Sequence, residues 1–181
     1  MLGLKHNANV LVDYDPSWAA EFASERQRLL NALDDTPEGI EHYGSTAVVG
    51  MRAKPILDIL VGILPLSKSV TCHNPLLDLG YDYAAHAGFP GHYIFGRGRD
   101  TTERTHLVHV VEYMGQSWQS NLAFRDALRQ SPELCAAYVA EKERALSAAP
   151  DSRAMYNELK HEFIELAKAK LVATKQGLDD Q

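Results

Sequence analysis

The sequence has few cysteines, no excess of basic residues and no long apolar run. Its 181 residues include two cysteines, Cys72 and Cys135, which lie far apart and form no Cys-x-x-Cys pair. Neither a disulfide framework nor a structural zinc site is therefore expected. The formal net charge of −6 argues against general nucleic-acid binding, because non-specific affinity for nucleic acids comes chiefly from basic surface.

No apolar run approaches the length of a membrane span, and the N-terminus lacks the regions of a secretory signal. We therefore expect no membrane partner and a cytoplasmic location. The P-loop, the Gly-x-Gly-x-x-Gly fingerprint and the Gly-x-Ser-x-Gly elbow are also missing, which argues against three common enzyme classes. An apolar content of 45% and a charged content of 23% are ordinary for a globular chain.

The order of the expected elements predicts an α+β fold in one domain, residues 1–181. A helix is expected at 16–33, because Asp15-Pro16 supplies an N-cap and a first helical residue. Strands are expected at 40–43, 56–63, 81–83, 92–96 and 105–113. Helices at 117–130, at 132–148 and from about 151 would make the C-terminal third, 117–173, helical. We expect a mixed sheet flanked by these helices.

One strand in the middle of the chain carries an isolated carboxylate, Asp58. The odd positions of the segment 56–63 are all apolar, and a period of two places Asp58 on the opposite face. A carboxylate in an apolar strand is costly unless it is solvated, paired or bound to a metal. Asp58 is therefore predicted to face a cleft as a base or metal ligand, or else to pair with Lys54 or Arg52.

The segment before this strand has the features of a phosphate site. Gly44, Ser45 and Thr46 offer backbone N–H groups and two hydroxyls at the start of a short helix, which suits an anion. Arg52 and Lys54 follow and can complement the same anion. The alternative is a tight turn that caps a short helix.

The segment 44–61 reads Gly-Ser-Thr-Ala-Val-x-Gly-x-x-Ala-Lys-Pro-Ile-x-Asp-Ile-Leu-Val and resembles the most recognisable segment of the GrpB family. The resemblance continues at 12–18, 79–81, 106–112 and 122–129, and so covers nearly the whole chain. It implies a nucleotidyltransferase-like fold.

In that superfamily a Gly-Ser turn precedes an Asp-x-Asp/Glu strand, and a neighbouring strand supplies a third carboxylate. The resemblance therefore implies that Asp58 is catalytic and binds Mg²⁺ or Mn²⁺, and that the partner is a nucleoside triphosphate with an unknown acceptor. Leu60 stands at the second acidic position, which argues against a two-metal mechanism. The alternative function is a non-catalytic module that binds a nucleotide or phospho-metabolite and has a degenerate metal site. A structural or adaptor domain is a third hypothesis.

A later expected strand carries His106, His109 and Glu112, which are candidate metal ligands, with Glu112 as the third carboxylate. The period of two places His106 and Glu112 on one face and His109 on the other, so both histidines face Asp58 only across a bulge. The alternative is that these histidines are hydrogen-bonded structural residues.

The last helix places Lys160 one turn after Tyr156, in a Tyr-x-x-x-Lys pattern similar to one in the family. Lys160 is a candidate to contact a triphosphate. The alternative is a surface lysine whose stem covers apolar neighbours.

Overall fold

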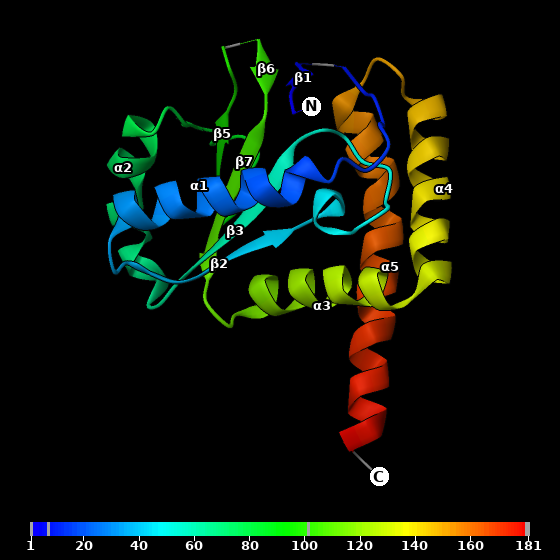
Figure 1. Cartoon of the computed structure of the whole chain (residues 1–181). Coiled ribbons are helices and arrows are strands. Elements are labelled where there is room, and N and C mark those ends of the chain that lie inside the picture. The colour runs from blue at the N-terminus through cyan, green and yellow to red at the C-terminus, as the bar shows by residue number, and fades with distance from the viewer. Residues whose placement is uncertain (1, 7, 101, 180–181) are drawn as a thin grey trace.

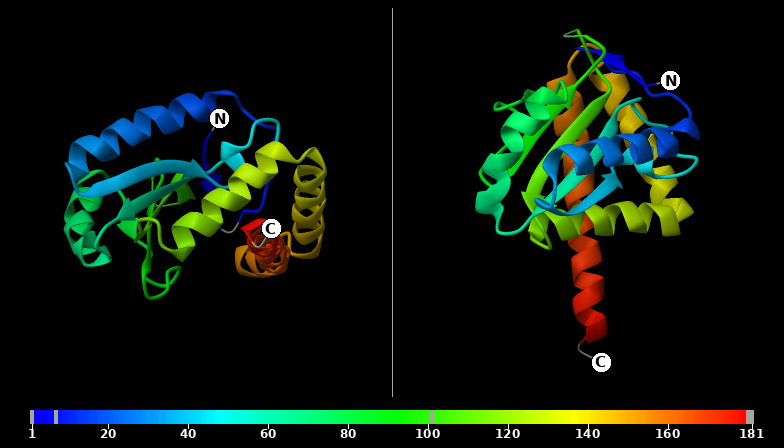
Figure 2. Two further views of the ribbon diagram at one scale, coloured as in Figure 1. Left: turned by 90° about the horizontal axis from the view of Figure 1, so that it is seen from below. Right: turned by 60° about the vertical axis from the view of Figure 1, so that its left-hand side comes forward.

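The structure is a computed structural model that describes residues 2–6, 8–100 and 102–179, with side chains to residue 171. A mixed sheet lies at its centre, and helices cover both faces (Figures 1 and 2). This arrangement confirms the predicted α+β fold with a mixed sheet flanked by helices.

The sheet has five strands in the order β2-β3-β7-β5-β4. Their bounds are Pro37–Tyr43 (β2), Leu57–Ile63 (β3), Asp82–Tyr83 (β4), His92–Arg97 (β5) and His106–Glu112 (β7). The central pair, β3 and β7, is parallel, and the other neighbours are antiparallel. A second, two-stranded ladder pairs β1 (Leu4–Lys5) with β6 (Glu103–Arg104), which the sequence did not predict.

The helices are α1 (Ser17–Leu33), η1 (Ser45–Ala47), η2 (Leu66–Cys72), α2 (His73–Asp78), α3 (Gln116–Gln130), α4 (Pro132–Ala148) and α5 (Arg153–Asp179). The four long helices, α1, α3, α4 and α5, begin close to the predicted residues. The start of α4 follows from its sequence. The Ser131 hydroxyl accepts a hydrogen bond from the Leu134 N–H, and Pro132 has no backbone N–H that would need a partner in the first turn. The last helix, α5, continues past the predicted end near residue 173 and extends beyond the rest of the molecule (Figure 1).

One face of the sheet packs against α1 and forms the main core. The odd residues of β3 are fully buried, as the alternating pattern predicted. Ile59, Val61 and Ile63 share one core cluster with Leu29 and Leu33 of α1, and Leu57 packs in a neighbouring cluster with Trp18 of the same helix. Burying such side chains stabilises the fold by roughly 1.5–3 kcal/mol each. Asp58, at an even position, lies on the opposite face.

A buried ionic network lies on the α1 face. The Glu25 carboxylate, 4% exposed, pairs with Arg97 at 2.6 Å and Arg28 at 2.7 Å. It also accepts a hydrogen bond of 2.8 Å from the Tyr81 hydroxyl. Arg97 continues the network to His106 Nδ1, 3.2 Å away. The network fastens α1 to strand β5 and to the segment before β4.

The other face of the sheet is only partly covered. Trp118 of α3 packs directly on Gly39 and Gly62, where an added Cβ would lie within 2.8 Å of the indole ring. These two glycines let α3 approach one end of this face closely. Towards the other end, Asp58 and His109 face α5 across an open space, and this space is the candidate site.

Candidate functional site

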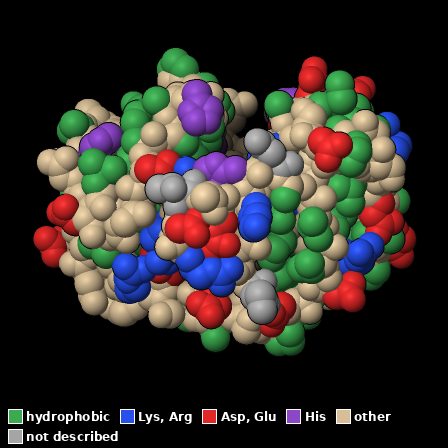
Figure 3. Space-filling model, turned by 90° about the horizontal axis from the view of Figure 1, so that it is seen from above, with side chains coloured by type: hydrophobic (Ala, Val, Ile, Leu, Met, Phe, Trp, Pro, Cys, Tyr) green, Lys and Arg blue, Asp and Glu red, His purple; other side chains and the backbone are tan. Residues whose placement is uncertain are grey.

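A cleft of about 830 Å³ lies between the sheet and helix α5. Its walls come from β3, β5, β7, the β4–β5 connection, α3 and α5. Seen from above, the molecule has a hollow with histidine side chains at its rim (Figure 3). A smaller recess of about 110 Å³ adjoins the cleft. Residues that line both are Ser45, Asp58, Leu107, Arg153, Asn157 and Lys160.

The turn before η1 lies directly against Asp58. Gly44 has φ +71° and ψ −170°, a conformation that essentially only glycine adopts. A Cβ on Gly44 would lie 2.5 Å from Asp58 Oδ2. Glycine at this position therefore allows both the turn and its contact with the carboxylate, and the structure brings Gly44, Ser45 and Asp58 together.

The register of the two parallel strands decides which histidine lies near Asp58. Asp58 pairs with Leu107 of β7, so His109, two residues further on, lies on the same face. His109 Nε2 is 3.8 Å from Asp58 Oδ1. The Asp58 side chain is 31% exposed, so it is open to a ligand in the cleft.

Lysines from three elements converge on the recess. Lys54 lies in the loop before β3, and its Nζ donates to Asn9 Oδ1 at 2.6 Å and lies 3.5 Å above the Tyr156 ring. Lys142 of α4 is 2% exposed. Its Nζ donates to Ser45 Oγ at 3.3 Å and also to the Arg52 carbonyl. Lys160 of α5 completes the set.

The positive charges in the recess are crowded and poorly solvated. Burial, with the nearby Lys160 and Arg153, lowers the pKa of Lys54 to about 7. Burial and Lys160 lower the pKa of Lys142 to about 7 as well. Burial also lowers the pKa of Lys160. Among the described residues that line the recess or the cleft, Asp58 is the only carboxylate. An anion bound here would relieve the repulsion between these cations.

Two residues predicted to hold a phosphate have other contacts. Thr46 is 2% exposed, and its hydroxyl lies 3.0 Å from His42 Nε2 and 3.4 Å from the Ile56 carbonyl. Arg52 forms an ion pair with Glu143 and lines a different pocket. Thr46 nevertheless lines the recess beside Ser45, so its predicted contact with the anion stays a prediction. Arg52 lies outside the recess, because its side chain turns to Glu143.

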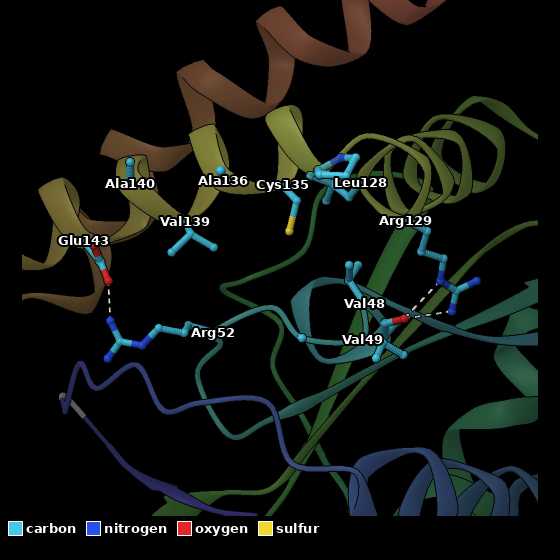
Figure 4. A pocket seen from close by; sticks show the side chains of 13 residues that line it. Val48, Val49, Arg52, Leu128, Arg129, Cys135, Ala136, Val139, Ala140 and Glu143 are labelled. Carbon is cyan, nitrogen blue, oxygen red and sulfur yellow. Dashed lines mark hydrogen bonds and ion pairs between the residues drawn. The ribbon is translucent and has the colours of Figure 1, made fainter.

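A separate groove of about 780 Å³ lies between η1 and α4 (Figure 4). Its described walls are mainly apolar, with Val48 and Val49 opposite Cys135 and Val139. The Arg52–Glu143 ion pair closes one end, and at the other Arg129 donates to the Ala47 carbonyl at 2.8 and 3.0 Å. This groove lies apart from Asp58 and brings no candidate residue besides Arg52.

Two of the four predicted metal ligands lie far from the cleft. His106 is on the α1 face, where burial and Arg97 lower its pKa to about 4. Glu112 pairs with Ile63 at the far end of the sheet, on the order of 16 Å along the strand from Leu107 at about 3.3 Å per residue. The predicted set of Asp58, Glu112, His106 and His109 is therefore corrected, and only His109 lies beside Asp58. No group of three or more His, Cys, Asp or Glu side chains in the described residues could hold a metal ion.

The sequence interpretation missed several residues of the site. Lys142 had a usable signal, since it stands one turn after Tyr138 in the buried stripe of α4. A lysine in an apolar stripe indicates a buried charge with a specific partner. Arg153 and His92 gave no such signal, because only the tertiary fold brings Arg153 to the cleft and His92 against His109.

The fold and the site together define an α+β protein with a cation-lined cleft between a mixed sheet and a C-terminal helix. The chain belongs to the GrpB family, whose model, described as "GrpB protein", matches residues 9–170. Within the described residues, no helix combines the length and apolar character that crossing a membrane requires.

Similar proteins support this assignment. The chain is 31% identical over 168 residues to the "Glutamate-rich protein GrpB" of Alkalihalophilus pseudofirmus, covering 91% of this chain and 97% of that protein. It is 36% identical over 152 residues to a "UPF0157 protein" of Pseudomonas aeruginosa, covering 83% of this chain and 62% of the relative. The crystal structure of the conserved protein GrpB from Enterococcus faecalis matches with a TM-score of 0.82 at 30% identity, covering 92% of this chain and 99% of that one.

Proposed function

We propose that this chain binds the phosphate groups of a nucleoside triphosphate in the recess between the Gly44-Ser45 turn and Asp58, as a metal-dependent nucleotidyltransferase-like enzyme. The observation that carries the proposal is the convergence of three lysines and Arg153 on a recess with one carboxylate, in a chain whose net charge is −6. Buried lysines with lowered pKa values gain most from an anionic partner.

Each residue has a role in this proposal. The backbone of the Gly44-Ser45 turn and the Ser45 hydroxyl hold a phosphate, while Lys54, Lys142 and Lys160 balance its charge. The adjoining cleft of about 830 Å³ accepts the nucleoside, since ligand pockets typically measure about 300–1,000 Å³. Asp58 takes the proton of the attacking acceptor group as a base, or would hold Mg²⁺ or Mn²⁺ beside the reacting phosphate.

The donor set fits one cation better than two. A pair of metal ions needs several bridging oxygens, yet Leu60 is fully buried at the second acidic position. Glu112 lies at the far end of β7 and gives no third carboxylate. These observations are the support for a second candidate function, a non-catalytic module that binds a nucleotide or phospho-metabolite with a degenerate metal site.

A thermal-shift panel of nucleoside triphosphates and inorganic triphosphate, followed by calorimetry, tests the proposal. A ligand at one hundred times its dissociation constant stabilises the folded state by roughly 2.7 kcal/mol. We expect Lys142→Met to weaken binding roughly 10- to 100-fold, since hydrogen bonds to charged groups contribute about 1.5–3 kcal/mol. Lys68→Met, which removes an exposed lysine of η2, is the matched control and should change nothing. Equal affinities in wild type and Lys142→Met would overturn the proposal.

The pH dependence of binding has a definite sign. Because the folded pKa of Lys54 and Lys142 lies near 7, below their usual 10.5, the unfolded chain holds more protons between those values. The free energy of unfolding without ligand should therefore rise with pH across that range, by up to about 1.4 kcal/mol per unit for each lysine. Triphosphate favours the protonated lysines, so its affinity should fall as pH rises above 7. Calorimetry in two buffers at pH 8 should detect proton uptake on binding.

A further inference from the structure

We infer that Asp58 and His109 form a site for one divalent transition-metal ion, and that His92 orients the histidine ligand. The ligand atoms are Asp58 Oδ1 and His109 Nε2. This inference deepens the proposed function, on which it rests for the phosphate oxygens that complete the coordination shell.

The separation of the two ligand atoms suits a shared ion. Metal–nitrogen and metal–oxygen bonds of about 2.0–2.2 Å place neighbouring ligand atoms roughly 3.0–3.5 Å apart at usual coordination angles. Asp58 Oδ1 and His109 Nε2 are 3.8 Å apart, which is too long for a hydrogen bond. A shift of a few tenths of an ångström lets both atoms bind one ion.

The hydrogen bonding of His109 supports a ligand role. His109 Nδ1 lies 2.9 Å from His92 Nε2. The rings of Tyr43 and His109 also pack at a right angle to each other, with their centroids 5.3 Å apart. These two contacts fix the orientation of the imidazole. A metal-bound histidine usually has such a partner on its other nitrogen.

The nitrogen that faces Asp58 is unsatisfied. His109 Nε2 is buried and has no hydrogen-bond partner among the described residues, an arrangement that costs free energy in a folded protein. If His109 Nδ1 donates its proton to His92, then the Nε2 lone pair points at the Asp58 carboxylate. A cation between the two removes this repulsion and satisfies both groups.

The ligand types indicate which metal is bound. Imidazole nitrogen suits later divalent metals such as Zn²⁺ and Co²⁺ best and Mn²⁺ less well, whereas Mg²⁺ prefers oxygen ligands alone. The site should therefore select a transition metal over Mg²⁺. With only two protein ligands, water or phosphate fills the remaining positions.

Titration of the metal-free full chain with Co²⁺, followed by visible absorbance, tests this inference without any nucleotide. We expect one equivalent to bind, with Mn²⁺ and Zn²⁺ competing and Mg²⁺ competing poorly. His109→Gln and Asp58→Asn should each weaken binding at least 10-fold. His92→Gln should weaken it roughly 10- to 100-fold, as for other partners of metal-bound histidines. His86→Gln, at an exposed histidine that lines the same cleft, should leave it unchanged.

The outcomes separate this inference from the proposed function. A folded wild type that binds no Co²⁺, or that binds it as tightly after His109→Gln, would overturn the metal site. Equal competition by Mg²⁺ would do the same. If triphosphate binds without any metal, the proposed phosphate site in the lysine recess stands even where the metal site fails. If metal binds but triphosphate does not, the metal site stands and the proposed phosphate binding fails.

Discussion

Gly44→Ala is expected to abolish triphosphate binding and to lower the free energy of unfolding by about 1–3 kcal/mol from backbone strain alone. The backbone at Gly44 has φ +71°, and the new methyl group would lie 2.5 Å from Asp58 Oδ2. The turn or the carboxylate must move, and each is part of the proposed phosphate site. Urea unfolding and calorimetric titration measure the two effects separately.

Gly50→Ala is the matched control. Gly50 has φ +79°, but in the described part of the chain no atom beyond its two sequence neighbours lies within 4 Å of the added methyl group. This variant should lose about 1–2 kcal/mol of stability and keep its affinity for triphosphate. If both variants bind triphosphate equally well, the close contact between the Gly44 turn and Asp58 has no part in binding.

Glu25→Ala should destabilise the fold by about 3–5 kcal/mol, the usual cost of removing one partner from a buried ion pair. Glu25 is the common partner of Arg28, Arg97 and Tyr81. Once the Glu25 carboxylate is removed, the Arg97 guanidinium stays charged on the core side of the sheet but loses this counterion. Chemical unfolding followed by circular dichroism gives the change.

The control for this prediction is Glu21→Ala, one turn earlier on α1 and exposed. Exposed substitutions usually change stability by less than about 0.5 kcal/mol. A loss of under about 1 kcal/mol for Glu25→Ala would show that the network contributes little to stability.

Much of the fold could be predicted because its signals are local. The alternation from 57 to 63 gave the buried face of β3, and Pro132 gave the start of α4. The ladder between β1 and β6 could not be predicted in this way. Two-residue strands have no measurable period, and Leu4 pairs with Arg104 only after the chain has folded.

The residues of the site likewise fall into those that local sequence patterns predict and those that only the tertiary fold brings together. Gly44, Ser45 and Asp58 belong to one short segment, so their proximity followed from the sequence. The strand period predicted that His106 and His109 face opposite sides, but only the register between β3 and β7 decides which one lies near Asp58. Lys142 reaches Ser45 from a helix 97 residues away in sequence, a distance over which local patterns carry no information.

The most direct test of the phosphate site is calorimetric titration of wild type and Asp58→Asn with triphosphate, in the presence and absence of Mn²⁺. Without metal, Asp58→Asn should bind as tightly as wild type or more tightly, because the carboxylate repels phosphate from the lysine recess. With Mn²⁺, wild type should gain affinity and Asp58→Asn should not. Equal gains in both proteins would contradict the role of Asp58, and no binding by either folded protein would contradict the phosphate site itself.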